Sequence, residues 1–424
     1  MKVKANGAGV PFFKRAAAAA KMLFGYDAVT NTRYRKNRGL QPLEDEETEL
    51  NNHDRDRLIS TLLNFKRNNP VVKGISRLRK VDVVGAGIHP QPQTGNEEFN
   101  DAALNLWQQW GENPEVTGMM DMAAVQKELV DSLLFYGDIG VLLTREGDLQ
   151  LIEGTRIGNN FSATGRLDSD DKQGVIIDKL GRPLAYMVGE RVGGILKNTR
   201  RVEARNMILY FKRMRPSQWR GIPEFAPAVN VLQDLEEYEN IEMISAKVAA
   251  SLAAVVKKEN AAQFEIIDRM APNEQDTTGR LDRFEPGAFH YLEPGEAIET
   301  ISASGRPNVD GIEWCFYRLR QIGAAVGVPV EMILATIGQT SFSASQGLVL
   351  QYQGAIEEEQ RRLVYVLNRI WKWKIRRWIA DGDLKGLENS EAFKVRWQLP
   401  AFRWINRAAQ VTSDQRYLQM GAMS

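Results

Sequence analysis

Residues that commonly carry catalytic or metal chemistry are sparse in this chain. Its 424 residues include one cysteine and three widely spaced histidines: Cys315, His53, His89 and His290. A single thiol excludes a disulfide framework or a thiolate cluster, and histidines this far apart in sequence argue against a zinc or di-iron site. Asp168, Asp170 and Asp171 could bind a cation, but a solvated turn is the favoured interpretation. We therefore expect neither a metal nor a cofactor.

Motifs for nucleotide chemistry are also missing. Val83-Val84-Gly85-Ala86-Gly87-Ile88 partly matches a dinucleotide fingerprint, but Pro90 stands where the third glycine is needed and would block the helix that holds the pyrophosphate. A glycine turn at the end of a strand is the favoured interpretation. No Gly-Lys-Ser/Thr and no Gly-x-Ser-x-Gly occurs, so neither a P-loop nor a nucleophile elbow is present. The sequence does not predict an enzyme.

Two segments suggest contact with a polyanion. The basic and tryptophan-rich segment 361–378 could stack on single-stranded nucleic acid, but Trp371 and Trp378 lie seven residues apart, on one helix face, which is typical of a core. The segment 336–347 is uncharged, small and polar, and Ser341 or Ser343 could cap the helix that follows. A neutral hydrophilic surface also suits a path along which a polyanion slides, because Lys and Arg contacts would hold it.

Composition places the chain among globular proteins of two or three modules. Apolar residues make up 43%, charged residues 26%, and 55 Lys and Arg nearly balance 54 Asp and Glu. The longest uncharged apolar stretch, 248–256, is too short to span a membrane, so we expect a soluble protein of a reducing compartment. Charge is nevertheless segregated: residues 1–40 carry nine basic residues, residues 41–56 seven acidic ones, and residues 57–80 seven basic ones. Solvated faces are the favoured interpretation, and pairing with neighbouring subunits or nucleic acid is the alternative.

Periodicity and turn residues predict a mixed α+β fold rather than a parallel βαβ sheet, because no helical crossover separates the central strands. The predicted helices cover residues 56–68, 71–80, 102–110, 123–136, 228–256, 311–326 and 343–379, the last with a kink. The predicted strands cover residues 81–84, 139–144, 149–153, 174–178, 183–188, 207–211 and 393–397.

The helix expected over residues 228–256 would be about 40 Å long. Its first half is acidic and contains no basic residue: Asp234, Glu236, Glu237, Glu239 and Glu242. Like charges at helical spacing repel, so either solvation or an external partner must account for them. A proline- and glycine-rich stretch follows over residues 257–308 and predicts short strands in a small separate module.

Six groups of short segments, in order over residues 55–405, resemble the lambda-like family of portal proteins from tailed bacteriophages. The first group combines residues 55–57, 68–70 and 83–87, and the second is residues 181–186. The third is residues 215–223 (Arg-Pro-Ser-Gln-Trp-Arg-Gly-Ile-Pro), and the fourth combines residues 235–238 and 246–250. The last two are residues 327–333 and 341–345. The chain departs from the family pattern at residues 339–343, where an Asn-Tyr-Ser-Ser-like loop is usual. It also departs at residues 404–407, where an Asp-Pro pair is common.

The resemblance implies a homo-oligomeric ring, usually of twelve subunits, through which double-stranded DNA is packaged into and ejected from the capsid. It implies an α+β ring subunit with a mixed wing, a long helical stem, a small β-containing clip and a short or absent crown. The N-terminal arm would be residues 1–50, the wing 51–228, the two stem helices 229–256 and 309–328, and the clip 257–308. Residues 329–405 would form the tunnel loop, the long helix and the return to the wing, and residues 406–424 a tail or short crown.

The resemblance also implies partners and sites. The clip would dock the large terminase subunit and then a head–tail adaptor, the ring would contact the major capsid protein, and no membrane is involved. The protein would reside at the portal vertex of the virion, and in the host cytoplasm during assembly. Candidate docking residues are Lys257, Lys258, Asp276, Arg280 and Arg283. Candidate residues lining the DNA tunnel are Gln339, Thr340, Ser341, Ser343, Ser345, Gln346, Asp234, Glu236, Glu239 and Glu242.

Two other classes of protein stay open. The first is a structural head–tail connector or adaptor that has no motor docking. The second is a nucleic-acid enzyme, such as a nuclease or a packaging ATPase, which would need a carboxylate cluster that binds metal or a P-loop. If the chain is a portal subunit, its acidic stem residues would repel the DNA backbone and keep the duplex centred in the channel.

Overall fold

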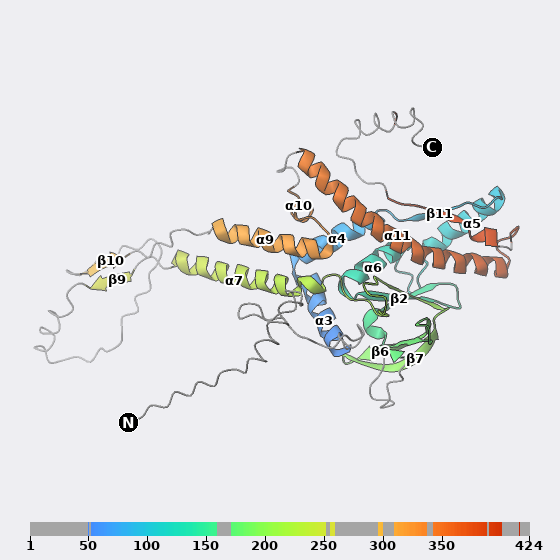
Figure 1. The fold of residues 1–424 in the computed structure, drawn as a ribbon, viewed down its shortest axis with the longest axis horizontal. Coiled ribbons are helices and arrows are strands. Elements are labelled where there is room, and N and C mark those ends of the chain that lie inside the picture. The colour runs from blue at the N-terminus through green and yellow to red at the C-terminus, as the bar shows by residue number, and fades with distance from the viewer. Residues whose placement is uncertain are drawn as a thin grey trace, which may run out of the picture.

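The computed structural model describes residues 50, 52–158, 171–251, 255–258, 296–299, 309–336, 342–387, 390–400 and 415. Figure 1 shows a body of helices and sheets, from which two neighbouring helices, α7 (Val229–Ser251) and α9 (Val309–Val326), extend to one side. The strands β9 (Val255–Lys258) and β10 (Glu296–Glu299) lie beyond the far ends of these helices. Within the described ranges, no helix is both long and apolar enough to cross a membrane.

The helices of the body begin and end at sequence signals. They are α3 (Asn52–Asn68), α4 (Pro70–Val84), α5 (Glu97–Gly111), α6 (Met122–Phe135) and α11 (Phe342–Asp381). Asn69 caps α4, because its side chain accepts hydrogen bonds from the backbone N–H groups of Val71 and Val72, and Pro70 occupies the first helical position. The 40-residue α11 is one continuous helix. It bends along its length in Figure 1, in agreement with the predicted kink.

The predicted strand over residues 81–84 is wrong. These residues form the last turn of α4, and Gly85, with φ of 57°, ends the helix at a backbone conformation that suits glycine. The glycine turn therefore follows a helix rather than a strand. Val83 and Val84 are buried in the main core, so packing of a helix face outweighs the β preference of valine.

The sheets of the body are small and antiparallel, as the lack of crossover helices indicated. A three-stranded sheet has the order β3 (Leu149–Glu153), β2 (Asp138–Leu143), β8 (Met207–Phe211). A four-stranded sheet has the order β4 (Asp171–Lys172), β5 (Val175–Ile177), β6 (Pro183–Val192), β7 (Ile195–Glu203). The strand β1 (His89–Pro92) pairs with β11 (Val395–Gln398). Both predicted hairpins are confirmed, with β2 paired to β3 and β5 paired to β6.

Sequence periodicity missed three strands of the body, namely the two-residue β4, β1 and β7. The strand β1 contains Pro90 and Pro92, which are unfavourable in strands. In β7 most side chains are exposed, so the alternation of apolar and polar residues that marks a half-buried strand is absent. The short elements that complete the body are η2 (Gly154–Arg156), η3 (Ala226–Ala228), α10 (Val330–Ile333) and η5 (Ser390–Phe393).

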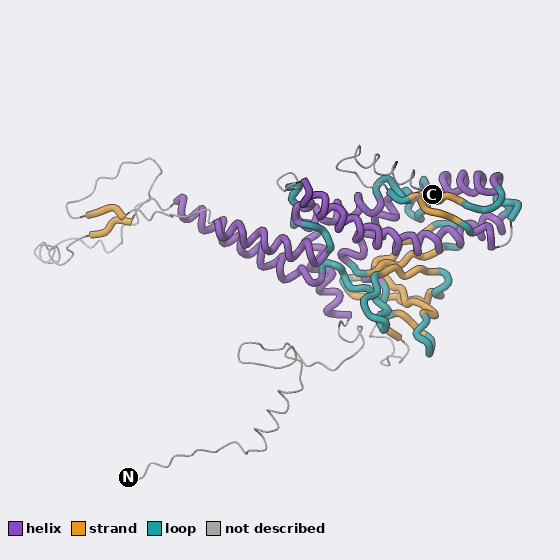
Figure 2. Tube along the Cα trace, turned by 45° about the horizontal axis from the view of Figure 1, so that its top comes forward, coloured by secondary structure: helices purple, strands orange, loops and turns teal. Residues whose placement is uncertain are grey.

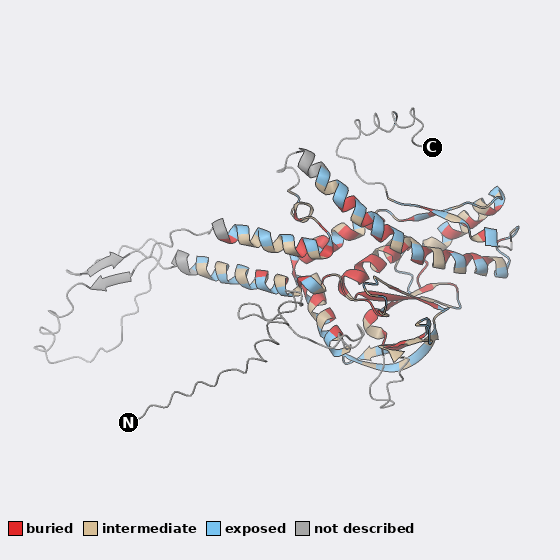
Figure 3. Cartoon of the chain, viewed as in Figure 1, coloured by how far each residue is buried: buried red, intermediate tan, exposed pale blue. Residues whose placement is uncertain are grey.

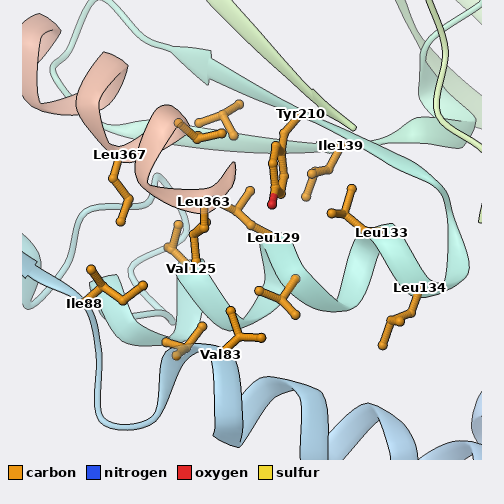
Figure 4. Close-up of a cluster of buried hydrophobic side chains, with 14 of the residues drawn as sticks. Val83, Ile88, Val125, Leu129, Leu133, Leu134, Ile139, Tyr210, Leu363 and Leu367 are labelled. Carbon is orange, nitrogen blue, oxygen red and sulfur yellow. The ribbon is translucent and has the colours of Figure 1, made fainter. Parts of the chain in front are cut away.

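The main core lies where α6 packs against α4, α11 and the three-stranded sheet. Figure 4 shows side chains from these elements converging there: Val83, Ile88, Val125, Leu129, Leu133, Leu134, Ile139, Tyr210, Leu363 and Leu367. A group of tryptophan rings extends the core toward β11, with Trp107 against both Trp371 and Trp397. Trp371 and Trp378 are buried, so the interpretation of segment 361–378 as core is confirmed.

The helix predicted over residues 228–256 ends earlier than expected. The structure has α7 to Ser251, whereas Val255 and Val256 belong to β9 and pair with Glu299 and Ile298 of β10. A valine pair suits a strand, and this pairing brings together two segments forty residues apart in sequence. The predicted helix over residues 311–326 is confirmed as α9.

Candidate functional site: the extended helix pair and the segment before α11

The helices α7 and α9 form a pair that extends away from the body, as Figures 1 and 2 both show. The rings of Tyr238 and Trp314 lie 4.6 Å apart between the two helices. Arg318 of α9 has its guanidinium 4.8 Å from the ring of Trp314, and a nitrogen of this group lies 3.4 Å from a carboxylate oxygen of Asp234. Aromatic and charged contacts therefore join the two helices, and Trp314 also packs against the main core.

The four acidic residues of α7 that were predicted to line the tunnel have different neighbours in the structure. Asp234 pairs with Arg318, so its charge is partly offset. An oxygen of Glu236 accepts a hydrogen bond of 2.7 Å from the side-chain amide of Asn69 in the body. Glu239 and Glu242 lie near Cys315 of α9, where burial and then their negative charges raise the pKa of the thiol. These carboxylates thus partly serve contacts within the chain.

Large apolar side chains are exposed on both helices of the pair. Their exposed fractions lie between 40% and 60%, and the residues are Ile241, Met243, Ile244, Ile312, Phe316 and Tyr317. Figure 3 shows how much of α7 and α9 is exposed beyond the body. Clusters of large exposed apolar side chains are typical of interaction surfaces. Sequence reasoning missed this surface because the acidic residues dominated the same stretch, although Ile241, Met243 and Ile244 stand among them.

Some predicted site residues fall outside the described residues, and they stay predictions. In the uncharged segment these are Gln339, Thr340 and Ser341, whereas Ser343, Ser345 and Gln346 lie in the first turns of α11. Lys257 and Lys258 are in β9, paired to Ala297 and Glu296 of β10. The other docking candidates, Asp276, Arg280 and Arg283, also fall outside the described residues. Among the described residues, no group of three or more His, Cys, Asp or Glu side chains could hold a metal ion.

The segment 215–223, which carried much of the resemblance, contains a buried arginine that sequence reasoning did not single out. Arg220 is 1% exposed and forms an ion pair of 2.7 Å with Asp138 at the start of β2. Its guanidinium also donates to three backbone carbonyls, at 2.7–2.8 Å: those of Gly154, Ile157 and Gln173. One side chain thus joins β2, η2 and the β4–β5 turn.

Two further contacts tighten the surroundings of this arginine. The backbone N–H of Gly221 donates to Asp138 at 2.9 Å, and Arg55 of α3 donates to the carbonyl of Gly221. A Cβ atom at Gly221 would lie 1.9 Å from the carbonyl oxygen of Gly137, so a larger residue does not fit. Burial alone would raise the pKa of Asp138, but the charge and hydrogen bonds of Arg220 hold that pKa below its usual range. These contacts assign a structural role to the segment.

A second buried polar network joins α4 to α11. Arg79 of α4 pairs with Glu359 of α11 and, at 3.3 Å, with Glu224. On the same two helices, the hydroxyl of Tyr352 donates to Asp82 at 2.8 Å. Burial raises the pKa of Glu359 to about 7, although Arg79 lowers it and Glu224 raises it further. Glu359 is fully buried, so desolvation of its charged form outweighs its ion pair.

This network predicts a dependence of stability on pH. Because the pKa of Glu359 is higher in the folded chain than its ordinary value of about 4.5, the folded state binds the extra proton between about pH 4.5 and 7. The free energy of unfolding should therefore fall as pH rises across this window, by at most about 1.4 kcal/mol per pH unit from this group. Glu359→Gln should remove that slope, as urea titrations at several pH values would show. An unchanged slope in the variant would contradict the assignment.

Comparisons with known proteins identify the family and the overall fold. The family described as "Phage portal protein, lambda family" matches residues 33–360. A "Probable portal protein" of Halomonas phage phiHAP-1 is 21% identical over 296 residues, which cover 66% of this chain and 55% of that protein. The chain thus matches just over half the length of this relative.

Solved structures share the fold. A chain from the virion of a native gene transfer agent particle aligns with a TM-score of 0.51 and 15% identity, over 87% of this chain and 89% of that one. A chain from the neck of the native particle, computed with C12 symmetry, aligns with a TM-score of 0.52 and 15% identity, over 86% and 89%. Because the family match covers most of the sequence, the chain belongs to the lambda family of phage portal proteins.

Proposed function

We propose that copies of this chain close into a ring at one vertex of a phage capsid and that double-stranded DNA passes through its centre. Membership of the portal family and the fold shared with the neck chain of a particle of C12 symmetry support a ring, with twelve subunits as the expected number. The role is structural, and the chain supplies surfaces rather than reacting groups.

The observation that carries the proposal is the exposed apolar surface of the helix pair α7–α9. Two helices that extend from a body cannot bury all their apolar side chains against each other. Ile241 and Ile244 on α7 and Phe316 on α9 keep 40–60% of their surface exposed. In a ring, the pair of one subunit lies between those of its neighbours, so these side chains become buried. Because each of these side chains is already about half buried, burial of the rest would contribute about 1 kcal/mol each.

In this arrangement, the acidic residues of α7 and the uncharged segment before α11 face the channel. Asp234, Glu236, Glu239 and Glu242 add negative potential near the duplex, and the neutral segment offers no strong phosphate contacts. Their partial pairing within the chain makes the repulsion weaker than four free carboxylates would produce. The β9–β10 strand pair lies at the far end of the helices, which suits docking of the terminase motor and then of a head–tail adaptor.

Ring closure is tested by placing charges on the helix pair. Ile241→Asp with Ile244→Asp should abolish rings, because each buried aspartate would cost several kcal/mol in the interface. Native mass spectrometry would show the loss of species that are multiples of the 47.8 kDa chain. Images of wild-type particles along their axis should show a central hole.

A matched control changes two exposed apolar residues of the body, Leu180→Asp with Met214→Asp, and should leave rings intact. Circular dichroism must show that the α7 variant is still folded. Rings that survive in the α7 variant would refute the interface, whereas wild-type particles without a central hole would refute the channel.

A further inference from the structure

The strand β7 forms an edge of the four-stranded sheet and is strongly basic. Among the described residues, β7 pairs with β6 alone, so one side of its backbone ladder has no strand partner there. The strand and the turn after it carry four basic residues and one acidic residue: Lys197, Arg200, Arg201, Arg205 and Glu203. All five are exposed, and only Arg201 and Glu203 pair with each other, at 3.5 Å, within the described part of the chain.

An exposed basic edge strand can bind a partner segment. Edge strands present unpaired N–H and C=O groups, and proteins usually cover them or protect them with charge. Here the charge is of one sign, so the complementary partner is an acidic extended segment. The chain itself contains such a segment: residues 43–49 read Leu-Glu-Asp-Glu-Glu-Thr-Glu, with five acidic residues and no basic one.

The start of the described chain lies beside this same sheet. The carbonyl of Leu50 accepts a hydrogen bond of 2.6 Å from the side chain of Gln173, in the turn between β4 and β5. Asp56 of α3 forms an ion pair of 2.6 Å with Arg191 of β6, whose neighbour Val192 pairs with Ile195 of β7. The acidic segment therefore joins the body next to the sheet that carries the basic edge.

The acidic segment is also long enough to reach the edge. Seven extended residues span about 23 Å. Neighbouring strands lie about 4.8 Å apart, so the distance across the sheet from β5 to a position outside β7 is about 15 Å. The middle of β6 adjoins the β4–β5 turn, since Met187 donates from its backbone to the carbonyl of Gly174. The chain can thus cross from Leu50 in about five residues and run two or three residues along β7.

We propose that the acidic segment 43–49 of the N-terminal arm crosses from Leu50 and docks its first residues, 43–45, along the basic edge of β7 in the same chain. Ion pairs between the acidic segment and Lys197, Arg200 and Arg201 hold it there, and the segment covers the free edge of the sheet. The docked segment would also fix the point at which the basic residues 1–40 leave the body. This proposal does not depend on the channel function.

Because Cys315 is the only cysteine, spin labels can be placed cleanly after Cys315→Ser. A nitroxide at Leu43→Cys, at the far end of the acidic segment from Leu50, should give a slow, immobilised component in its electron paramagnetic resonance spectrum. Arg200→Glu with Arg201→Glu should abolish that component. Adding Glu44→Lys and Asp45→Lys to this variant should restore it, because the charges of the two partners are then exchanged. Raising salt from 0.1 to 1 M shortens the screening length from about 10 to about 3 Å and should weaken the component.

Lys73→Glu with Arg77→Glu is the matched control, because it makes the same change in net charge on the exposed face of α4 and should leave the spectrum unchanged. A second label at Ile195→Cys, in chains diluted with unlabelled chains, tests whether the contact is within one chain. A short distance that persists on dilution supports the proposal. Three results would overturn the proposal: a label at residue 43 that stays mobile in the parent, one that stays immobilised after Arg200→Glu with Arg201→Glu, or a short distance that is seen only between chains. Native mass spectrometry of the same samples reports ring formation separately.

Discussion

Arg220→Ala is expected to lower the free energy of unfolding of the body by about 3–5 kcal/mol, because it leaves the buried carboxylate of Asp138 without its counter-charge. The same change removes the donors that satisfy three carbonyls on η2, Ile157 and the β4–β5 turn. Chemical denaturation followed by circular dichroism would measure the loss. Arg220→Lys should also be strongly destabilising, since one ammonium group cannot replace a planar set of five donors.

The control for this prediction is Arg201→Ala, which removes an exposed arginine from the ion pair with Glu203. Exposed pairs contribute about 0–1 kcal/mol, so this variant should unfold close to the wild type. The double change Arg220→Met with Asp138→Leu should recover only part of the loss, because it removes the unpaired charge but leaves the three carbonyls without donors. Equal stability of Arg220→Ala and Arg201→Ala would contradict the assigned role.

Trp371→Ala is expected to cost about 3–5 kcal/mol, the usual range for removing a fully buried aromatic side chain. The ring of Trp371 lies 5.2 Å from that of Trp107 and 6.4 Å from that of Trp397, so the substitution would open a cavity between α5, α11 and β11. Thermal unfolding monitored by calorimetry would measure the effect. Binding of single-stranded DNA by the folded variant should equal that of the wild type, because the ring is buried.

Trp371→Phe serves as the matched variant. The indole N–H of Trp371 is buried with no hydrogen-bond partner in the described part of the chain, and phenylalanine removes this unsatisfied donor. Its expected cost is therefore smaller, about 1–2 kcal/mol, from the lost ring volume alone. A phenylalanine variant as unstable as the alanine variant would show that packing volume does not explain the effect.

Strongly patterned local segments were predictable from sequence. The hairpins β2–β3 and β5–β6 follow from alternating apolar residues around glycine-containing turns, and α9 follows from its helical periodicity and the Gly327 that ends it. Trp371 and Trp378 were assigned to the core from their spacing of seven residues, and both are buried. Each of these features depends mainly on residues close in sequence.

Features that depend on distant partners were not predictable in the same way. Val81–Val84 has the composition of a strand but completes α4, because the side chains of Val83 and Val84 pack into the main core. Val255 and Val256 leave the helix to pair with β10, forty residues later. The role of Arg220 was hidden because its partners, Asp138, Gly154 and Gln173, come from segments far apart in the chain.

Local composition and spacing were sufficient to predict the α+β class, the long acidic helix, and the order of motifs that resemble a portal protein. Only the tertiary structure showed that acidic residues of α7 also contact Arg318 and Asn69, and that apolar side chains on α7 and α9 stay exposed. The reason is physical: periodicity reports which face of an element is apolar. Whether that face is covered, and which charges are paired, depends on neighbours brought together by folding.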